Sequence, residues 1–579
     1  MLTKKIIKRR AETALQISSS LHPLLQRIYA ARGISSAQEL ERGLEKLLPF
    51  NEMLGMDVAV KLLADAIQQQ KNILIVGDFD ADGATSTAVA IHALKGFGAQ
   101  HVDYLVPNRF AFGYGLTPEL VHVAKKMEPF VIVTVDNGIA NHAGVETAKQ
   151  LGIKVIVTDH HLPATTLPPA DAIVNPNQHG DLFPSKNMAG VGVIFYVMLA
   201  LRRYLSEQNW FQQQNIPEPN MSRLLDLVAL GTIADVVPLD HNNRILVYQG
   251  LRRIRAGHCV PGITALLEVS GKNFARVMAS DLGFSVAPRL NAAGRLDDMS
   301  LGIECLITSD LSSAREMAAA LTQLNDERRV IEHDMQDQAL EALKKIQPHE
   351  KINGLCLFDE GWHQGVIGIL AGRMKDRLHR PVIAFALANE KELKGSARSI
   401  SGLHIRDVLA DIAATHPTLI DKFGGHAMAA GLTLSRAHFD QFSRVFNQIV
   451  SAKLNEMDLQ NALLSDGELD SSTLSLESAE LLREAGPWGQ SFPEPLFDGV
   501  FQILEQRLVG GRHLKLVLSQ SEKMIDAIAF NVDINQWPDY RCDAVRIAYR
   551  LDVNEYRSKR SVQLIIEHIE AEAYAKNHF

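Results

Sequence analysis

Three aspartates at alternate positions are the strongest candidates for chemistry in this 579-residue chain. Asp78, Asp80 and Asp82 stand in the segment Gly-Asp-Phe-Asp-Ala-Asp-Gly, directly after a short aliphatic run that predicts a buried strand. Carboxylates this close repel one another unless cations share them, and hard oxygen ligands suit Mg²⁺ or Mn²⁺. A turn that caps the following helix needs only one aspartate. The segment therefore predicts a divalent-metal site.

Further acids and two imidazoles follow other predicted strands or a buried helix. They are Asp136 after residues 130–135, the Asp159-His160-His161 triplet after residues 154–157, and Asp235 after residues 222–234. Singly, each fits an ordinary turn or a satisfied polar side chain. Because the carboxyl ends of parallel strands meet at one edge of a sheet, we expect them to join the aspartates there. Such a set offers enough ligands for two cations, and imidazole favours Mn²⁺ over Mg²⁺.

Strands that alternate with amphipathic helices must position these groups. The strands are predicted over residues 72–76, 101–106, 130–135, 154–157 and 172–174, with helices over 84–95, 118–127 and 142–150 between them. This alternation predicts an α/β fold, a doubly wound and mostly parallel sheet with helices on both faces.

The second half of the chain has a different organisation. Residues 311–346 contain no Gly or Pro and predict one long connecting helix, whose charged middle suits a solvated face. A second, smaller α/β unit follows over about 352–436. Five short strand candidates between residues 500 and 566 predict a C-terminal barrel of the OB type.

Composition excludes several classes of protein. Hydrophobic residues make up 46 % and charged residues 22 % of the chain, as in folded soluble proteins, so a disordered or fibrous chain is excluded. The four cysteines are widely spaced, which argues against a disulfide scaffold and favours a reducing, cytoplasmic location. The longest uncharged apolar stretch, 187–201, is too short to span a membrane. The net charge of −8 does not indicate DNA binding, although residues 501–560 hold ten Lys/Arg against eight Asp/Glu.

These motifs resemble, in order, the four motifs of the DHH phosphoesterase superfamily. Residues 395–399 (Gly-Ser-Ala-Arg-Ser) and 423–427 (Phe-Gly-Gly-His-Ala) resemble the DHH-associated domain of that superfamily. Residues 288–295 and 362–368 resemble its bacterial exonuclease branch, and the likeness covers nearly the whole chain. The four metal motifs show no departure from the family pattern; Phe79 stands where the family often has Tyr, a change that does not involve a metal ligand.

The resemblance implies a metal-dependent 5′→3′ exonuclease of single-stranded DNA that acts in DNA recombination and repair. It implies two divalent cations, Mn²⁺ or Mg²⁺, and protein partners such as single-stranded DNA-binding protein and repair helicases, with no membrane. The implied domains are an N-terminal helical segment (1–49), a DHH catalytic domain (50–310), the connecting helix (311–348), the DHH-associated substrate-binding domain (349–450) and an OB-like nucleic-acid-binding domain (451–579).

The resemblance also assigns roles to individual residues. The implied metal ligands are Asp78, Asp80, Asp82, Asp136, His160 and Asp235, with Asp136 as the bridge and Asp78 as either a ligand or a support for one. The implied catalytic set is Asp136, His160, His161, Asp235 and Arg289, with His161 donating to the substrate phosphate. The implied substrate-binding set is Arg109, Arg289, Asn291, Arg295, Ser396, Arg398, Gly424, Gly425 and His426. We interpret Asp159 as the group that orients a neighbouring imidazole.

Three other functions would also use some of these motifs. A DHH phosphodiesterase for short oligonucleotides or cyclic dinucleotides would share the metal motifs, although the predicted barrel and the segments around Trp362 and Arg289 disfavour it. A non-catalytic DNA-binding replication or repair scaffold would have lost metal ligands, whereas every motif acid is present here. Covalent phosphatase chemistry at Asp78, with Asp80 as the acid, would leave the Asp-His-His triplet without a role.

Overall fold

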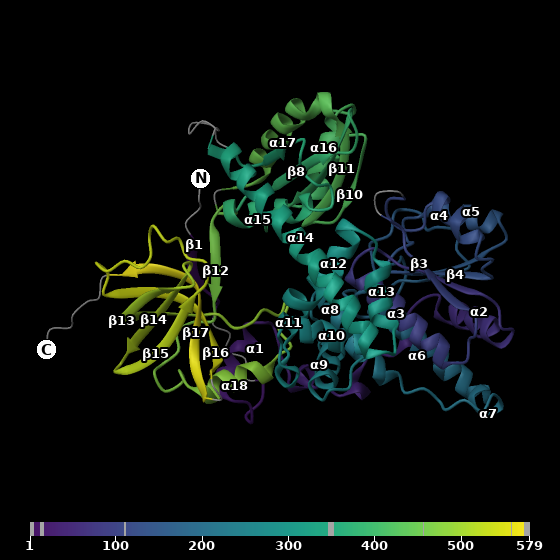
Figure 1. Cartoon of the computed structure of the whole chain (residues 1–579), viewed down its shortest axis with the longest axis horizontal. Coiled ribbons are helices and arrows are strands. Elements are labelled where there is room, and N and C mark those ends of the chain that lie inside the picture. Colours follow the sequence, from purple (N-terminus) through teal and green to yellow (C-terminus); the bar gives the residue numbers. More distant parts are fainter. Residues whose placement is uncertain are drawn as a thin grey trace.

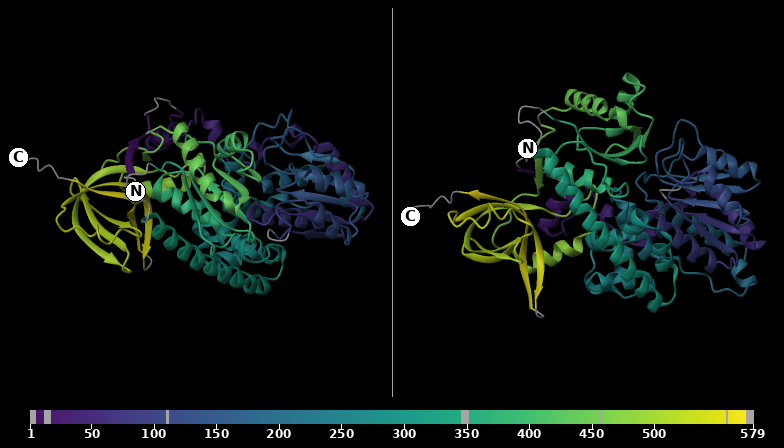
Figure 2. Two further views of the ribbon diagram at one scale, coloured as in Figure 1. Left: turned by 90° about the horizontal axis from the view of Figure 1, so that it is seen from above. Right: turned by 45° about the horizontal axis from the view of Figure 1, so that its top comes forward.

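The structure is a computed structural model that describes residues 5–11, 17–108, 112–344, 352–455, 457–556 and 559–572. It is elongated, with a parallel-sheet unit at one end, a β-barrel at the other and a second sheet unit above the helices between them (Figure 1). The two further views in Figure 2 keep the barrel and the parallel-sheet unit at opposite ends. Among the described residues, no helix combines the length and apolarity needed to cross a membrane.

The first unit is the predicted doubly wound sheet. Its order is β3-β2-β4-β5-β6, and every neighbouring pair is parallel. The strands are β2 (Ile73–Val76), β3 (Val102–Leu105), β4 (Val131–Val135), β5 (Lys154–Thr158) and β6 (Ala172–Val174). They consist largely of β-branched and aliphatic residues because both faces of the sheet are covered.

Helices cover both faces of this sheet. One core contains residues of α2 (Met56–Gln68), α3 (Ala81–Gly96) and α6 (Gly190–Glu207) together with alternate residues of β2 and β4. A second core joins α4 (Pro118–Lys125) and α5 (His142–Gln150) to the opposite face. The predicted fold class is therefore confirmed for this unit.

A helical region links the first unit to the rest of the chain. Its members are α7 (Trp210–Gln213), α8 (Leu225–Ala234), α9 (His241–Arg255), α10 (Pro261–Val269), α11 (Ala279–Asp281), a π-helical turn η6 (Leu282–Val286), α12 (Ala287–Leu296) and α13 (Ser300–Ile307). The long helix α14 (Leu311–Lys344) then runs toward the second sheet.

Asp326, Glu327 and Arg329 in the charged middle of α14 are exposed, as the sequence predicts, but Arg328 is buried. Arg328 is 8 % exposed and Glu332 is 7 % exposed, and the two side chains form an ion pair. Arg373, on α15 (Ile367–Leu378), donates to Glu332 at 2.8 Å. The charges are buried because α15 packs on this stretch of α14, a contact between distant segments that local composition does not reveal.

The second unit has a five-stranded sheet in the order β10-β11-β9-β8-β7. The strands are β7 (Leu355–Phe358), β8 (Val382–Leu387), β9 (Glu392–Arg398), β10 (Lys422–Gly425) and β11 (Ala429–Ser435). Only β7 and β8 pair in parallel. Helices α16 (Ile405–Thr415) and α17 (Phe439–Lys453) contribute to the core beneath this sheet.

The C-terminal unit is a closed barrel with the order β13-β14-β15-β17-β16, as predicted. Its strands are β13 (Phe497–Val509), β14 (His513–Gln520), β15 (Lys523–Ala529), β16 (Ala544–Tyr556) and β17 (Lys559–Glu572), and α18 (Leu476–Ala485) precedes it. Closure of the barrel leaves no long free strand edge.

The N-terminal segment differs from the helical one that was expected. Besides α1 (Pro23–Ala30) and three 3₁₀ turns, η1 (Ala37–Leu40), η2 (Leu44–Lys46) and η3 (Phe50–Glu52), it holds a strand, β1 (Lys5–Arg9). β1 pairs in parallel with β12 (Asn461–Ser465), which leads into the barrel. Arg9 donates to the buried carboxylate of Asp498 at 2.9 Å, so the N-terminal segment fastens the barrel to the rest of the chain.

Candidate metal centre

The ends of neighbouring parallel strands bring the acidic motifs to one edge of the first sheet. Val76 pairs with Thr134, and Val135 pairs with Thr158, so the residues that follow these strands lie side by side. The strand ends place three aspartates there: Asp78, Asp136 and Asp159. All three are buried, with at most 3 % of their surface exposed.

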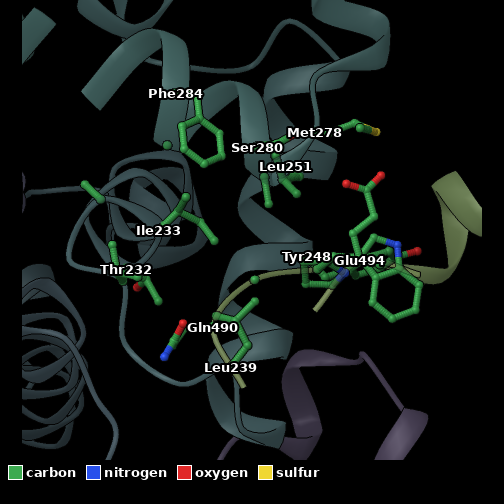
Figure 3. A pocket seen from close by; sticks show the side chains of 18 of the residues that line it. Thr232, Ile233, Leu239, Tyr248, Leu251, Met278, Ser280, Phe284, Gln490 and Glu494 are labelled. Atoms are coloured by element: carbon green, nitrogen blue, oxygen red, sulfur yellow. The ribbon is translucent and has the colours of Figure 1, made fainter. Parts of the chain in front are cut away.

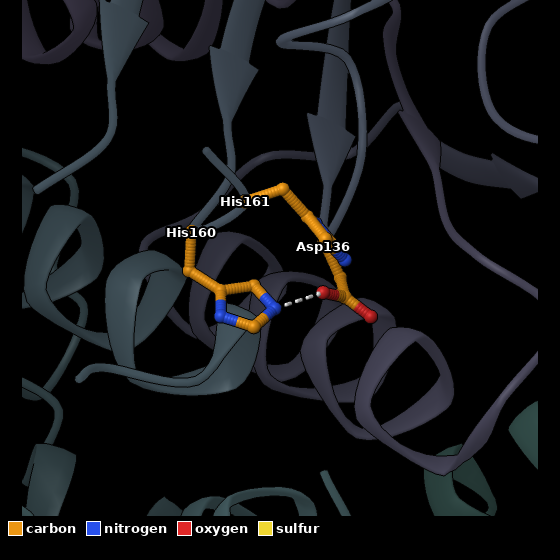
Figure 4. A group of neighbouring side chains, drawn as sticks. All are labelled: Asp136, His160 and His161. Atoms are coloured by element: carbon orange, nitrogen blue, oxygen red, sulfur yellow. Dashed lines mark ion pairs between the residues drawn. The ribbon is translucent and has the colours of Figure 1, made fainter. Parts of the chain in front are cut away.

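Three groups of side chains can each hold a metal ion, because the possible ligand atoms within each group lie within 4.8 Å of one another. The groups overlap in their members. They are Asp78 with Asp80 and Asp136, Asp136 with His160 and His161, and Asp82 with His160 and Asp235. Asp136 and His160 each belong to two groups. His160 Nε2 lies 3.1 Å from Asp136 Oδ1 and 3.5 Å from Asp235 Oδ2, and Figure 4 shows the first of these contacts.

The ligand atoms of this cluster that lack other partners suit divalent cations. Asp136 Oδ1 and His160 Nε2 are buried and contact each other at 3.1 Å, and neither makes a hydrogen bond to any other described group. Burial, followed by repulsion from neighbouring carboxylates, raises the pKa of Asp82 to about 7 and that of Asp136 well above its usual range. Burial also lowers the pKa of His160, which keeps the imidazole neutral and able to bind a metal. A cation would supply the positive charge that these groups lack.

The N-terminus of α6 holds Asp82 in place. The carboxylate of Asp82 accepts the backbone N–H of Gly190 at 2.6 Å and that of Val191 at 3.0 Å. A side chain at position 190 would meet Asp136 Cβ at 2.6 Å, so only glycine lets the helix approach this closely. The Gly-Val-Gly ahead of the apolar run of α6 is the sequence signal for this close approach, although nothing in its spacing indicates Asp82 as the partner.

Asp159 orients His161. His161 Nδ1 donates to Asp159 Oδ1 at 2.7 Å, and the carboxylate also accepts the backbone N–H groups of His160 and Ile139. Burial lowers the pKa of the His161 imidazole, but the charge and hydrogen bond of Asp159, with the charges of Asp235 and Asp78, together outweigh it and raise this pKa to about 9. Burial raises the pKa of Asp159, but the charge and hydrogen bond of His161, the charge of His160 and the N–H of Ile139 together lower it to about 2. Without a bound metal, the ion pair with Asp159 thus favours the protonated form of His161.

The second sheet unit reaches the same site. The ring of His426, which follows β10, lies 5.6 Å from the ring of His161 between centroids. Arg398, at the end of β9, donates to Ser396 Oγ at 3.1 Å. A side chain at Gly368 would lie 2.9 Å from the guanidinium of Arg398 and 3.0 Å from Ser396 Oγ. The glycine thus lets α15 pack closely against the polar corner that Arg398 and Ser396 form.

Other predicted site residues have structural partners. Arg289 Nε donates to Thr322 Oγ1 at 3.0 Å, and Arg295 Nη1 donates to the carbonyl of Gly365 at 3.1 Å. Asn291 Oδ1 accepts the N–H of Ala81 at 2.8 Å and so holds the start of α3. Gly424 and Gly425 lie in the exposed strand β10. Arg109 lies outside the described residues.

Tyr114 is a neighbour of the site that the sequence analysis did not single out. Its hydroxyl donates to the backbone carbonyl of Asp136 at 3.1 Å and lies 3.5 Å from His161 Nε2. Its ring stands edge-on to that of Phe79. A tyrosine in a glycine-rich loop has no spacing signature, so only the fold reveals this contact.

Comparisons with known proteins agree with this geometry. Three family models match: the DHH family, N-terminal domain over residues 72–232, the DHHA1 domain over 351–452 and the RecJ OB domain over 465–568. A protein of Escherichia coli named single-stranded-DNA-specific exonuclease RecJ is 53 % identical over 566 residues, which cover 97 % of this chain and 98 % of the relative. A protein of the same name from Dickeya dadantii is 55 % identical over 567 residues, with the same coverage. The chain belongs to the RecJ family.

Solved structures extend this family relationship to metal binding. The crystal structure of RecJ from Thermus thermophilus in complex with Mn²⁺ matches with a TM-score of 0.78 at 29 % identity, over 96 % of this chain and 76 % of that one. The Mg²⁺ complex from the same organism matches with a TM-score of 0.73 at 28 % identity, over 96 % and 75 %. The expectation of Mn²⁺ or Mg²⁺ as the cofactor is thus confirmed at the level of the RecJ family.

Proposed function

We propose that this chain is a metal-dependent exonuclease that hydrolyses single-stranded DNA from its 5′ end, in DNA recombination and repair. The observation that carries the proposal is the set of three overlapping donor groups that share Asp136 and His160. The names of the RecJ relatives support the substrate. Contacts with single-stranded DNA-binding protein and repair helicases, and a cytoplasmic location, stay predictions from the resemblance.

The donor groups support a site for two cations. When bound, two divalent ions would polarise the phosphate oxygens and activate a water molecule for in-line attack. Asp136 belongs to the group with Asp78 and Asp80 and also to a group with His160, so its carboxylate can bridge both ions. Asp82 and Asp235 complete the group around His160. No side-chain nucleophile is required.

His161 and His426 would act on the substrate phosphate. Asp159 holds the His161 imidazole in its protonated form. The ring Nε2–H can then donate a hydrogen bond to a phosphate oxygen, and its positive charge can offset the negative charge of the transition state. His426 stands beside it from the second unit, so the substrate would be enclosed between the two units.

The polar corner formed by Arg398 and Ser396 suits the terminal phosphate of a strand. The guanidinium carries five N–H donors, of which the described contacts use only part. Gly368 lets these two side chains pack against the first turn of α15, where backbone N–H groups favour an anion. A terminal phosphate bound here would fix the direction of digestion.

Digestion of a single strand labelled at either end tests this proposal. With Mn²⁺ or Mg²⁺ we expect mononucleotides to leave first from the 5′ end, and with a chelator we expect no digestion. Asp136→Asn should lower turnover by about a thousandfold, because several kcal/mol of metal-dependent stabilisation is lost. Asp103→Asn, on the exposed face of β3, is the matched control.

The same assay separates the alternative functions. Equal digestion of blunt duplex would contradict the preference for single strands, and faster turnover of a dinucleotide than of a long strand would favour the short-oligonucleotide phosphodiesterase. A chain that binds DNA but never cuts it, with or without a chelator, would favour the scaffold.

A further inference from the structure

A cavity of about 340 Å³ lies between the metal centre and the barrel. Its walls come from the end of α8, from α9, from the segment 278–284 and from residues 483–494, which lead into β13. The cavity lies within the size range of ligand sites, roughly 300–1,000 Å³. Residues 232–234, 236 and 237 of its wall flank the metal-site residue Asp235. The same chain segment therefore forms part of the cavity wall and carries the metal-site residue Asp235.

Aromatic and apolar side chains dominate this cavity. Figure 3 shows Thr232, Ile233, Leu251 and Phe284 around the same space. Phe284 is 81 % exposed, an unusual position for a large aromatic side chain. It stands in the π-helical turn η6, a feature often found at functional sites. Arg289 donates to the carbonyl of Ser285 in that turn and so ties it to the predicted site.

The two arginines that line the cavity donate to other groups of the protein, although Arg483 Nε has no hydrogen-bond partner within the described structure. Arg255 Nε donates to the carbonyl of Val277 at 2.9 Å, and Arg483 Nη2 donates to Asp552 at 2.8 Å. Glu494 is paired with Arg550. The cavity therefore suits a neutral, flat, aromatic group with polar edges better than a phosphate, and a nucleobase is such a group.

We propose that this cavity receives one nucleobase of the single strand, on the barrel side of the bond that is cut. The base would lie against Phe284, among the apolar side chains of the cavity wall. The inference rests on the proposed function, because a single DNA strand that extends from the metal centre to the barrel would cross the junction at which the cavity lies. It adds a base-binding residue, Phe284, to a site that otherwise contacts phosphate.

A series of strands with one abasic position tests the inference. The full-length protein with Mn²⁺ is assayed for release of the first nucleotide, and kcat/KM is measured with the abasic position moved stepwise away from the cut end. For the wild type we expect one position at which loss of the base lowers kcat/KM about tenfold, the effect of losing one stacked base. Phe284→Ala should lower kcat/KM about tenfold on the intact strand.

The decisive result is the combination of the two changes. Phe284→Ala should show no further loss when the base is missing at that one position, whereas Phe284→Tyr should behave as the wild type. Val58→Ala, which trims an exposed apolar side chain on α2, is the matched control and should keep the full abasic effect.

Three outcomes would overturn the inference alone. The first is an unchanged kcat/KM for Phe284→Ala, which would leave the cavity to another occupant such as a peptide. The second is a loss of kcat/KM that is the same at every abasic position. The third is a wild type whose kcat/KM does not respond to abasic positions. A wild type that cuts no strand would instead contradict the proposed function, and the inference with it.

Discussion

The imidazole rings of His161 and His426 lie 5.6 Å apart between centroids at an interplanar angle of 37°, although His161 follows the parallel sheet and His426 follows β10 of the second sheet. His161 is held by Asp159, and His426 contributes to none of the three candidate metal groups found among the described residues. The second unit therefore places a histidine beside the metal cluster, outside the candidate ligand groups of the described residues.

Replacing His426 should separate substrate binding from metal binding. We expect His426→Ala to lower kcat/KM on single strands by about 10- to 100-fold, the size of effect typical of a supporting group, and to leave Mn²⁺ affinity within about twofold. Titration with Mn²⁺ and initial rates measure the two effects. His416→Ala, which alters a histidine beyond the end of α16, is the control. A parallel loss of Mn²⁺ affinity would contradict the assignment.

Asp159→Asn should change the pH dependence of turnover. The pKa of His161 is about 9 because Asp159 faces it, and the amide of Asn would remove that attraction. The His161 pKa should then fall toward its usual value near 6.5, so the neutral form takes over at neutral pH. We expect a 10- to 100-fold loss at pH 8 and a smaller loss at pH 6. A uniform loss at every pH would show that Asp159 has only a structural role.

Without metal, the stability of the protein should fall as pH rises from about 4 to 7. Burial, with added repulsion from neighbouring carboxylates, raises the pKa values of Asp82 and Asp235 to about 7, so the folded chain binds more protons than the unfolded chain in that range. The free energy of unfolding then decreases with pH. Mn²⁺ should raise the Tm more at pH 7.5 than at pH 5. A metal-free Tm that rises between pH 5 and 7 would contradict the cluster's assignment.

Gly190→Ala should disrupt the metal centre from outside its ligand set. The added methyl group would meet Asp136 Cβ at 2.6 Å and force α6 away from the Asp82 carboxylate. We expect Mn²⁺ affinity to fall by tenfold or more, in the range seen when supporting groups are lost, with a lower Tm. Gly372→Ala, within α15, is the matched control, because its methyl group would meet no atom within 4 Å and should stabilise the helix by about 1 kcal/mol. Equal effects of the two changes would argue against this contact.

Local patterns sufficed to predict the parallel sheet and the metal centre. Aliphatic runs mark the strands, and the acids and histidines directly follow them, so parallel pairing alone brings Asp78, Asp136 and His160 together. The polar corner of the second unit, with Arg398 and Ser396, was reached through family resemblance and not through spacing.

Contacts between distant segments could not be predicted. The pairing of β1 with β12 joins strands more than 450 residues apart, and neither strand indicates its partner. Arg328 resembles a solvated charge in the sequence and becomes buried only because α15 supplies Arg373 to the shared Glu332. The cavity beside Phe284 likewise forms from four separate segments, so no single motif encodes it.

The number of Mn²⁺ ions bound per chain is the most direct test of the central claim, that the cluster around Asp136 and His160 holds a pair of ions. Electron paramagnetic resonance of free Mn²⁺ during titration of the chelator-treated protein gives this number. We expect two sites for the wild type and the loss of at least one in Asp136→Asn. A wild type that binds one ion or none, or an Asp136→Asn variant that still binds two with unchanged affinity, would contradict it.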